Sequence, residues 1–206
     1  MKTIAIISQK GGAGKTTLAI HLAVAAEQSK QSAAIIDLDP QASATGWGDH
    51  RSSDTPAVVS AQAARLPQVR EAASKAGAVL AVIDTAPHSE SAALAAARAA
   101  DLILIPCRPA ILDLRAIQAT IDLAKLAGKP VAVVLNSVPP RGPLGDDAVE
   151  AIGVYGVEVC PVRVGHRAVF VHSLTEGLSA LEHDPEGKGA NEIRQLYMWA
   201  CRQVGL

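Results

Sequence analysis

Short aliphatic runs alternate along this chain with longer segments whose apolar residues recur every three or four positions. The aliphatic runs are typical of strands buried on both faces, since such strands have no polar side. We expect strands at Thr3–Ile7, Ala33–Asp37, Val79–Asp84, Leu102–Pro106, Val131–Asn136 and Val157–Cys160. We expect helices at Lys15–Ser29, Leu66–Lys75, Ser89–Ala99, Leu112–Ala127, Asp146–Tyr155 and Ala190–Val204.

Alternating strands and helices predict βαβ units, and therefore an α/β fold with a mostly parallel, twisted sheet and helices on both faces. Three polar segments without periodicity are expected to be loops: Asp49–Pro56, Val138–Gly145 and Glu182–Ala190. Neither a repeat nor a change of composition divides the chain, so we expect residues 1–206 to form a single domain. Ligands of such sheets bind beyond the carboxyl ends of the strands, which is where candidate residues should lie.

The composition restricts which side chains can form the core and which partners the protein can bind. The core must be built from small and aliphatic side chains, because 49% of the residues are hydrophobic but only 2% are aromatic. A formal net charge of −1 provides no overall positive field that would attract nucleic acid, so DNA binding would need a local basic patch.

The cysteines Cys107, Cys160 and Cys201 have neither disulfide nor metal-site spacing. With no signal peptide and no apolar run of the roughly 18 residues that cross a membrane, we expect a cytoplasmic protein that does not bind membranes.

A glycine-rich segment, Lys10 to Thr17, follows the first expected strand and opens the first long helix. Glycines let backbone N–H groups turn inward around phosphate oxygens, and the helix N-terminus adds its dipole. Lys15 can reach the β- and γ-phosphates, and the Thr16 hydroxyl can bind Mg²⁺. The sequence therefore predicts a P-loop NTPase fold with ATP and Mg²⁺ as cofactors. The expected phosphate-binding residues are Gly11, Gly12, Ala13, Gly14, Lys15, Thr16 and Thr17.

The segment departs from the general P-loop pattern at its start. Gln9 stands where the general pattern has glycine, and Lys10 precedes a glycine pair. This form, K-G-G-x-G-K-[ST], resembles the deviant Walker A motif of the ParA/MinD family of dimeric ATPases. The resemblance implies that Lys10 reaches the nucleotide of a partner subunit, and that the active species is an ATP-bound homodimer.

Three aspartates follow aliphatic strands. Asp37 and Asp39 point the same way in an extended chain, towards the strand-end crevice. They match the family's D-x-D-P-Q signature, which implies that Asp39 positions the attacking water and that Asp37 joins the Mg²⁺ shell or supports the P-loop. Asp84 ends another strand as a Walker B carboxylate does, and is expected to hold Mg²⁺ with Thr16. Phosphoryl transfer requires mainly positioning and charge, so Lys10, Lys15 and Asp39 are the expected catalytic residues of an ATPase that is slow without a partner.

The base site is implied by the same resemblance. Asn136 ends a strand and corresponds to the asparagine that bonds adenine in ParA-like proteins, with Pro161 and Val162 as neighbours; an asparagine that caps a turn is the alternative. Asp113 corresponds to a segment near the dimer interface, and helix capping explains it equally well.

The stretch after Val162 resembles the C-terminal part of small plasmid-partition ParA proteins, which lack an N-terminal helix-turn-helix. That resemblance implies a protein that partitions plasmid or chromosomal DNA and associates with the nucleoid when bound to ATP. Its expected partners are non-specific DNA and a small ParB-like centromere-binding protein that stimulates hydrolysis. The candidate DNA contacts are Arg163, Arg167, Lys188, Arg194 and Arg202.

Two other function classes stay open. A protein of the same fold could position a non-DNA cargo, as MinD-like or microcompartment-positioning ATPases do. A P-loop metabolic enzyme is the other class, either a dethiobiotin-synthetase-like ligase or an iron-protein reductase. The three dispersed cysteines do not fit a reductase, and a ligase needs neither the D-x-D-P-Q element nor Lys10.

Overall fold

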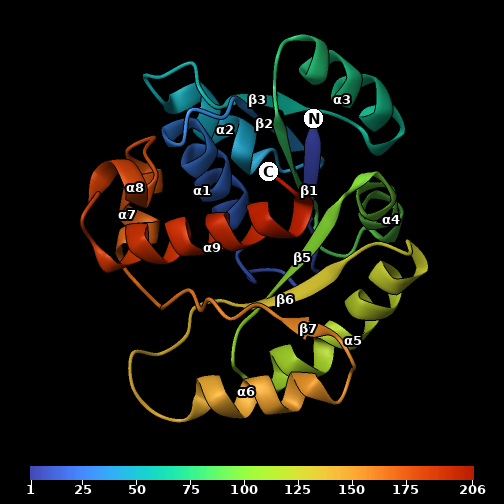
Figure 1. Ribbon diagram of the computed structural model, residues 1–206, viewed down its shortest axis with the longest axis vertical. Coiled ribbons are helices and arrows are strands. Elements are labelled where there is room, and N and C mark those ends of the chain that lie inside the picture. The colour runs from blue at the N-terminus through green and yellow to red at the C-terminus, as the bar shows by residue number, and fades with distance from the viewer.

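The computed structural model describes all 206 residues and contains one seven-stranded sheet, in the order β3-β2-β4-β1-β5-β6-β7 (Figure 1). Every strand pair is parallel, which confirms the predicted α/β fold and its parallel sheet. The strands are β1 (Lys2–Ile6), β2 (Ala33–Asp37), β3 (Ala57–Ser60), β4 (Leu80–Asp84), β5 (Leu102–Cys107), β6 (Val131–Leu135) and β7 (Glu158–Val159).

The longer helices match the sequence expectations to within a few residues. The helices are α1 (Lys15–Gln28), α2 (Ser43–His50), α3 (Leu66–Lys75), α4 (Glu90–Ala99), α5 (Ile111–Leu126), α6 (Leu144–Gly153), α7 (Val169–Thr175), α8 (Ala180–His183) and α9 (Lys188–Val204), with a 3-10 turn at Ala63–Arg65. None of these helices combines the length and the apolar composition that crossing a bilayer requires.

Four elements were not expected from the sequence, namely β3, α2, α7 and α8. The expected loop at Asp49–Pro56 is wrong at its start, because Asp49 and His50 complete α2. The loop expected at Glu182–Ala190 is shorter than predicted, since α8 ends at His183 and α9 begins at Lys188. These elements are short or lie at the sheet edge, where local periodicity is weakest.

The sheet separates two hydrophobic layers. One layer lies under α1, α2 and α7–α9, and the other lies under α3–α6. Residues of β1 and the residue that follows it alternate between these layers: Ile4 and Ile6 face the first layer, whereas Ala5 and Ile7 face the second. All three cysteines are buried and free, in agreement with the absence of disulfide spacing.

The candidate residues converge at the carboxyl ends of the central strands. The glycine-rich loop leaves β1, which lies between β4 and β5 at the middle of the sheet. Asp37 at the end of β2 is in register with Asp84 at the end of β4, and Asp84 is in register with Ile6 of β1. Because these ends are neighbours, residues about 70 positions apart in sequence can build one site.

Candidate nucleotide-binding site

The glycine-rich loop adopts a conformation that glycine favours. Gly12 and Gly14 have φ angles of 72° and 96°, which L side chains rarely adopt. A Cβ added to Gly14 would lie 2.1 Å from Nδ2 of Asn136, so the close approach of these two residues also requires glycine. The loop leads directly into α1, whose first N–H groups are therefore free to bind an anion.

Lys15 lies in the first turn of α1 and is buried. Its Nζ donates a 3.4 Å hydrogen bond to the carbonyl oxygen of Lys10, across the loop. Burial lowers the pKa of Lys15, and the nearby carboxylates of Asp84 and Asp39 offset part of that shift. Lys15 therefore lies within the glycine-rich loop and close to the carboxylates of Asp84 and Asp39.

Thr16 and Asp84 form the part of the site that suits a metal ion. The Thr16 hydroxyl donates a 2.6 Å hydrogen bond to Asp84 Oδ2, while Asp84 Oδ1 is buried with no hydrogen-bond partner. Burial raises the pKa of Asp84 to about 7, the Thr16 bond opposes that rise, and the charge of Asp37 adds to it. A hydroxyl beside a carboxylate with one unsatisfied oxygen is an oxygen donor set that fits Mg²⁺, whose charge would stabilise the ionised carboxylate.

Asp37 is fully buried and holds the segment that follows it. Its Oδ1 accepts a 3.0 Å bond from the backbone N–H of Asp39, and its Oδ2 accepts 3.0 Å bonds from both the N–H and the hydroxyl of Thr45. Both oxygens are thus engaged with the chain, which favours the supporting role over direct contact with the metal. Asp39 itself is half-buried, and its charge raises the pKa of Asp84.

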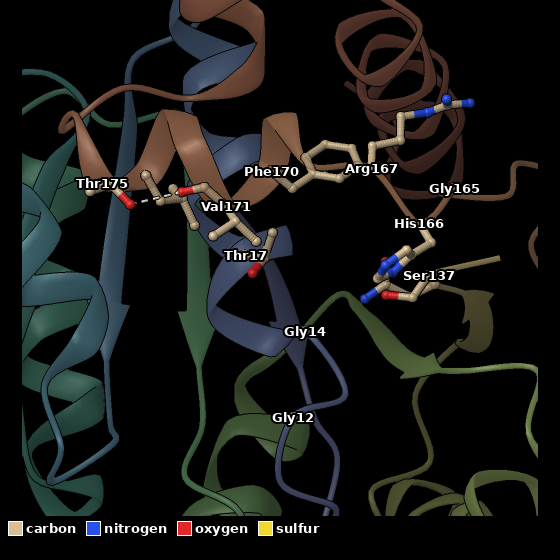
Figure 2. A pocket seen from close by; sticks show the side chains of 12 residues that line it. Gly12, Gly14, Thr17, Ser137, Gly165, His166, Arg167, Phe170, Val171 and Thr175 are labelled. Atoms are coloured by element: carbon tan, nitrogen blue, oxygen red, sulfur yellow. Dashed lines mark hydrogen bonds between the residues drawn. The ribbon is translucent and has the colours of Figure 1, made fainter. Parts of the chain in front are cut away.

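A cavity of about 500 Å³ opens beside the glycine-rich loop (Figure 2). Its lining residues are Gly12, Gly14, Thr17, Asn136, Ser137, Gly165, His166, Arg167, Phe170, Val171, Leu174 and Thr175. Asn136 is buried in its wall and donates a 2.8 Å bond from Nδ2 to the carbonyl of Ala13. The position of this cavity, adjacent to the phosphate loop, suits a nucleoside.

The far wall of the cavity was not foreseen. Pro161 and Val162 are not among its lining residues, and the segment from Gly165 to Thr175 occupies that side instead. A parallel bridge joins Val138 to Gly165 and brings the loops after β6 and β7 together, so that Ser137 and His166 lie close to each other (Figure 2). The local sequence does not identify these residues as part of the cavity wall, because the pairing of two loops distant in sequence brings them to the cavity.

Lys10 contacts its own chain. Its Nζ lies 2.9 Å from Asp113 Oδ2, and Arg108 Nε lies 3.0 Å from the other oxygen of the same carboxylate. Burial raises the pKa of Asp113, but the bonds from Lys10 and Arg108 outweigh that effect and hold the pKa below its usual value. Asp113 therefore binds Lys10 and Arg108 in an ion-pair cluster. It does not cap α5, because the N-cap residue of that helix is Ala110 and no side chain caps it.

The five basic residues proposed from sequence lie in different environments. Arg167 pairs with both oxygens of Glu192 and lines the cavity, so its charge is compensated. Arg163 forms an exposed pair with Asp146 at 2.7 Å. Arg194 donates to the carbonyl of Pro185, and Lys188 and Arg202 are exposed on α9. Three of these residues thus lie along one helix, α9, and Arg167 lies at the cavity beside the glycine-rich loop.

Comparison with known proteins agrees with this geometry. Residues 4–169 match the family described as the CobQ/CobB/MinD/ParA nucleotide binding domain. The chain is 36% identical over 209 residues to maintenance of carboxysome distribution protein A of Gloeobacter kilaueensis, covering 98% of this chain and 94% of the relative. It is 30% identical to the protein of the same name from Halothiobacillus neapolitanus, covering 94% of each. Protein IncC of Escherichia coli is 26% identical over 95% of this chain and 68% of the relative.

Solved structures share the fold. Apo McdA of Cyanothece superposes with a TM-score of 0.80 at 18% identity, with both chains fully covered. A variant of the same protein in complex with ATP superposes with a TM-score of 0.78 at 17% identity, covering 100% of this chain and 97% of that one. Since the family match spans the glycine-rich loop, the Walker B strand and Asn136, this chain belongs to the CobQ/CobB/MinD/ParA nucleotide-binding family.

Proposed function

We propose that this protein is a switch ATPase that binds ATP with Mg²⁺, dimerises, and hydrolyses ATP slowly until a partner stimulates it. The observation that carries the proposal is the joint presence of a P-loop, a Thr16–Asp84 pair with an unsatisfied buried oxygen, and the additional Lys10. A ligase of the same fold requires the first two features but not the third.

Each group has a defined role in this proposal. The backbone from Gly11 to Thr17 binds the phosphates, and Lys15 reaches the β- and γ-phosphates. Thr16 and Asp84 hold Mg²⁺, which neutralises charge on the phosphates, while Asp37 supports the segment beside them. Asp39 orients the attacking water, and Asn136 with the neighbouring cavity holds the nucleoside.

Dimerisation is supported by the surroundings of Lys10. Its side chain is 31% exposed, so it can leave Asp113 without disturbing the core. Ile111 and Leu112, next to Asp113 at the start of α5, are 63% and 67% exposed. Large apolar side chains beside a partly exposed cation favour a second copy of this chain as the partner of this face, with Lys10 reaching the phosphates bound by that copy.

The proposed cargo is a protein body rather than a plasmid. Two relatives at 30% identity or more, each aligned over nearly its whole length, are named for the distribution of carboxysomes. Non-specific DNA is the proposed surface on which the ATP-bound dimer assembles, through Arg163, Lys188, Arg194 and Arg202. We expect the protein to be cytoplasmic and, when bound to ATP, to associate with the nucleoid. We also expect a separate, cargo-bound protein to stimulate its ATP hydrolysis.

Plasmid or chromosome partition is the second candidate, and the similarity to the chromosome-partitioning ATPase Soj of Thermus thermophilus favours it. Deleting the gene separates the two: loss of even spacing of protein bodies supports the first candidate, and loss of a plasmid from dividing cells supports the second. In both cases a ParB-like partner or its cargo-bound counterpart is expected to stimulate hydrolysis.

DNA binding is tested with a random-sequence duplex, with no nucleotide, with ADP, and with a non-hydrolysable ATP analogue. We expect binding only with the analogue, and an affinity that falls with added salt because phosphate contacts release counterions. The Arg194→Ala/Arg202→Ala variant should bind more weakly, whereas Lys75→Ala, which alters an exposed ion pair on α3, should not. Equal binding in all nucleotide states would contradict an ATP-gated DNA surface.

A further inference from the structure

We infer that Arg51 is a positioning residue for hydrolysis: through α2 it fixes the Asp39 segment relative to the α7–α8 segment that lines the nucleoside cavity. This inference rests on the proposed function. It concerns a cluster that we call the α2–α8 joint, which consists of Trp47, Arg51, Gly177, Leu178 and Glu182.

Arg51 directly follows α2 and is almost entirely enclosed. Its side chain is 4% exposed, and Nη2 lies 2.9 Å from Glu182 Oε1. Nη1 donates to the carbonyl of Gly177 at 3.2 Å, and the guanidinium lies 4.4 Å above the ring of Trp47. A planar guanidinium with several donors holds its partners in one orientation, which a flexible lysine cannot do. One side chain thus ties the end of α2 to two points of the α7–α8 segment, Gly177 and Glu182.

Two further contacts tie α2 and the residue after it to the loop between α7 and α8. Trp47 Nε1 donates to the carbonyl of Leu178 at 3.2 Å. Gly177 has a φ of 70°, and a Cβ there would lie 2.9 Å from Arg51 Cα, so the two backbones touch. The bond from Arg51 and the Ser179 N–H oppose the effect of burial and hold the pKa of Glu182 below its usual value, so that the ion pair is charged at neutral pH.

The other end of α2 holds Asp39. Thr45, in the first turn of α2, donates from both its N–H and its hydroxyl to Asp37, which also accepts the N–H of Asp39. The Ala42 N–H donates to the carbonyl of Asp39 at 2.8 Å. The segment that carries the water-positioning carboxylate is therefore continuous with α2, and a shift of α2 along its axis would move Asp39.

Between its two ends α2 has open space beside it. A cavity of about 470 Å³ lies between α1, α2 and α7, bordered by Thr16, Trp47 and Leu174 among others. The sheet side of α2 is packed, since Ala44 and Trp47 are buried and Gly48 lies against Val58 of β3. Together with this packing, the Asp37 anchor and the α2–α8 joint set the position of α2.

The α7–α8 segment in turn contacts the nucleotide site. Phe170 and Thr175 of α7 line the nucleoside cavity (Figure 2). His21 of α1 accepts a 3.0 Å bond at Nε2 from the Ala180 N–H of α8 and packs edge-on against Phe170 at 5.1 Å. Through α2, the α2–α8 joint therefore connects the segment that lines the nucleoside cavity to Asp39, which is proposed to position the attacking water. Arg51 holds this connection in place.

The test measures kcat and KM for ATP hydrolysis and the Kd of a non-hydrolysable analogue, for wild type, Arg51→Ala and Arg51→Lys. Rates are taken per bound nucleotide, at protein concentrations that saturate dimerisation, so that unfolded molecules do not count. We expect kcat to fall by about ten- to a hundredfold in Arg51→Ala, because small misplacements of reacting groups cost that much, with Kd changed less than about threefold. Arg51→Lys, which keeps the charge and folds more readily, should show a smaller loss in kcat with the same unchanged Kd.

The double variant Arg51→Ala/Asp39→Ala decides whether Arg51 acts through Asp39. If it does, the double variant hydrolyses ATP no more slowly than Asp39→Ala alone, because both changes remove one function. Independent, multiplicative losses would overturn the inference, as would wild-type kcat in both Arg51 variants. If wild type does not hydrolyse ATP, or Asp39→Ala hydrolyses it at the wild-type rate, the proposed function itself fails.

Discussion

At the residue scale, the site depends on a few buried polar groups whose charge the fold controls. Asp84 combines a pKa raised to about 7 by burial with one unsatisfied oxygen, a combination that a bound cation would relieve. The convergence of Lys15, Thr16 and Asp84 could be predicted, because the first two belong to one motif and the third ends an aliphatic strand. The ion pair between Lys10 and Asp113 could not be predicted, because those residues are 103 positions apart in the chain.

His21 supplies a residue-scale prediction about pH. Burial lowers its pKa to about 4, with partial compensation from its bond to the Thr17 carbonyl and from Glu182. The ring is neutral in the fold, donating from Nδ1 to Thr17 and accepting at Nε2 from Ala180. Since the folded pKa lies below the unfolded value of about 6.5, the unfolded chain binds more protons between these values and stability is lost as pH falls.

We expect wild type to lose about 2–3 kcal/mol more unfolding free energy than His21→Gln between pH 7 and pH 4.5. Urea unfolding at a series of pH values measures this difference, and groups common to both proteins cancel. If the difference in unfolding free energy between the two proteins stayed constant across that pH range, His21 would not titrate as its burial requires.

At the element scale, long elements were predictable and short ones were not. The aliphatic runs of β1, β2, β4, β5 and β6 placed those strands correctly, because each is buried on both faces of the sheet. The seven-residue α7 and the four-residue α8 are too short for a periodic signal, and α8 combines a local capping box of Ser179 and Glu182 with the distant bond from Ala180 to His21. The nucleoside cavity was only half predicted for the same reason: Asn136 follows a strong strand, whereas its opposite wall is α7.

Gly14→Ala tests the junction between the phosphate loop and β6. The new Cβ would meet Asn136 Nδ2 at 2.1 Å in a backbone conformation that alanine resists, so the bond from Asn136 to Ala13 should break. Strain of this kind costs about 1–3 kcal/mol, and we expect nucleotide affinity to fall by about tenfold or more.

Isothermal titration with an ATP analogue and Mg²⁺ measures the affinity of Gly14→Ala. Gly153→Ala on α6 is the matched control, because its Cβ meets nothing within 4 Å and its φ is not positive. Wild-type affinity in Gly14→Ala would contradict the placement of the nucleotide against this loop.

At the scale of the whole molecule, the parallel sheet and the P-loop class followed from the sequence, but the cargo did not. The C-terminal pattern favoured plasmid partition, whereas the similarity to carboxysome-distribution proteins favours a protein body. Both cargoes use the same nucleotide switch, so residues that hold the nucleotide carry no information about what is moved. The hydrophobic pattern of the chain does not show which of its surfaces would contact the cargo.

Under the proposed function, ATP controls the association of two copies through Lys10. Light scattering of wild type and Lys10→Ala, with Mg²⁺ and either ADP or a non-hydrolysable ATP analogue, tests it most directly. We expect a dimer only for wild type with the analogue, and monomers in the other three samples. A wild-type protein that stays monomeric with the analogue, or a Lys10→Ala protein that dimerises as readily as wild type, would contradict it.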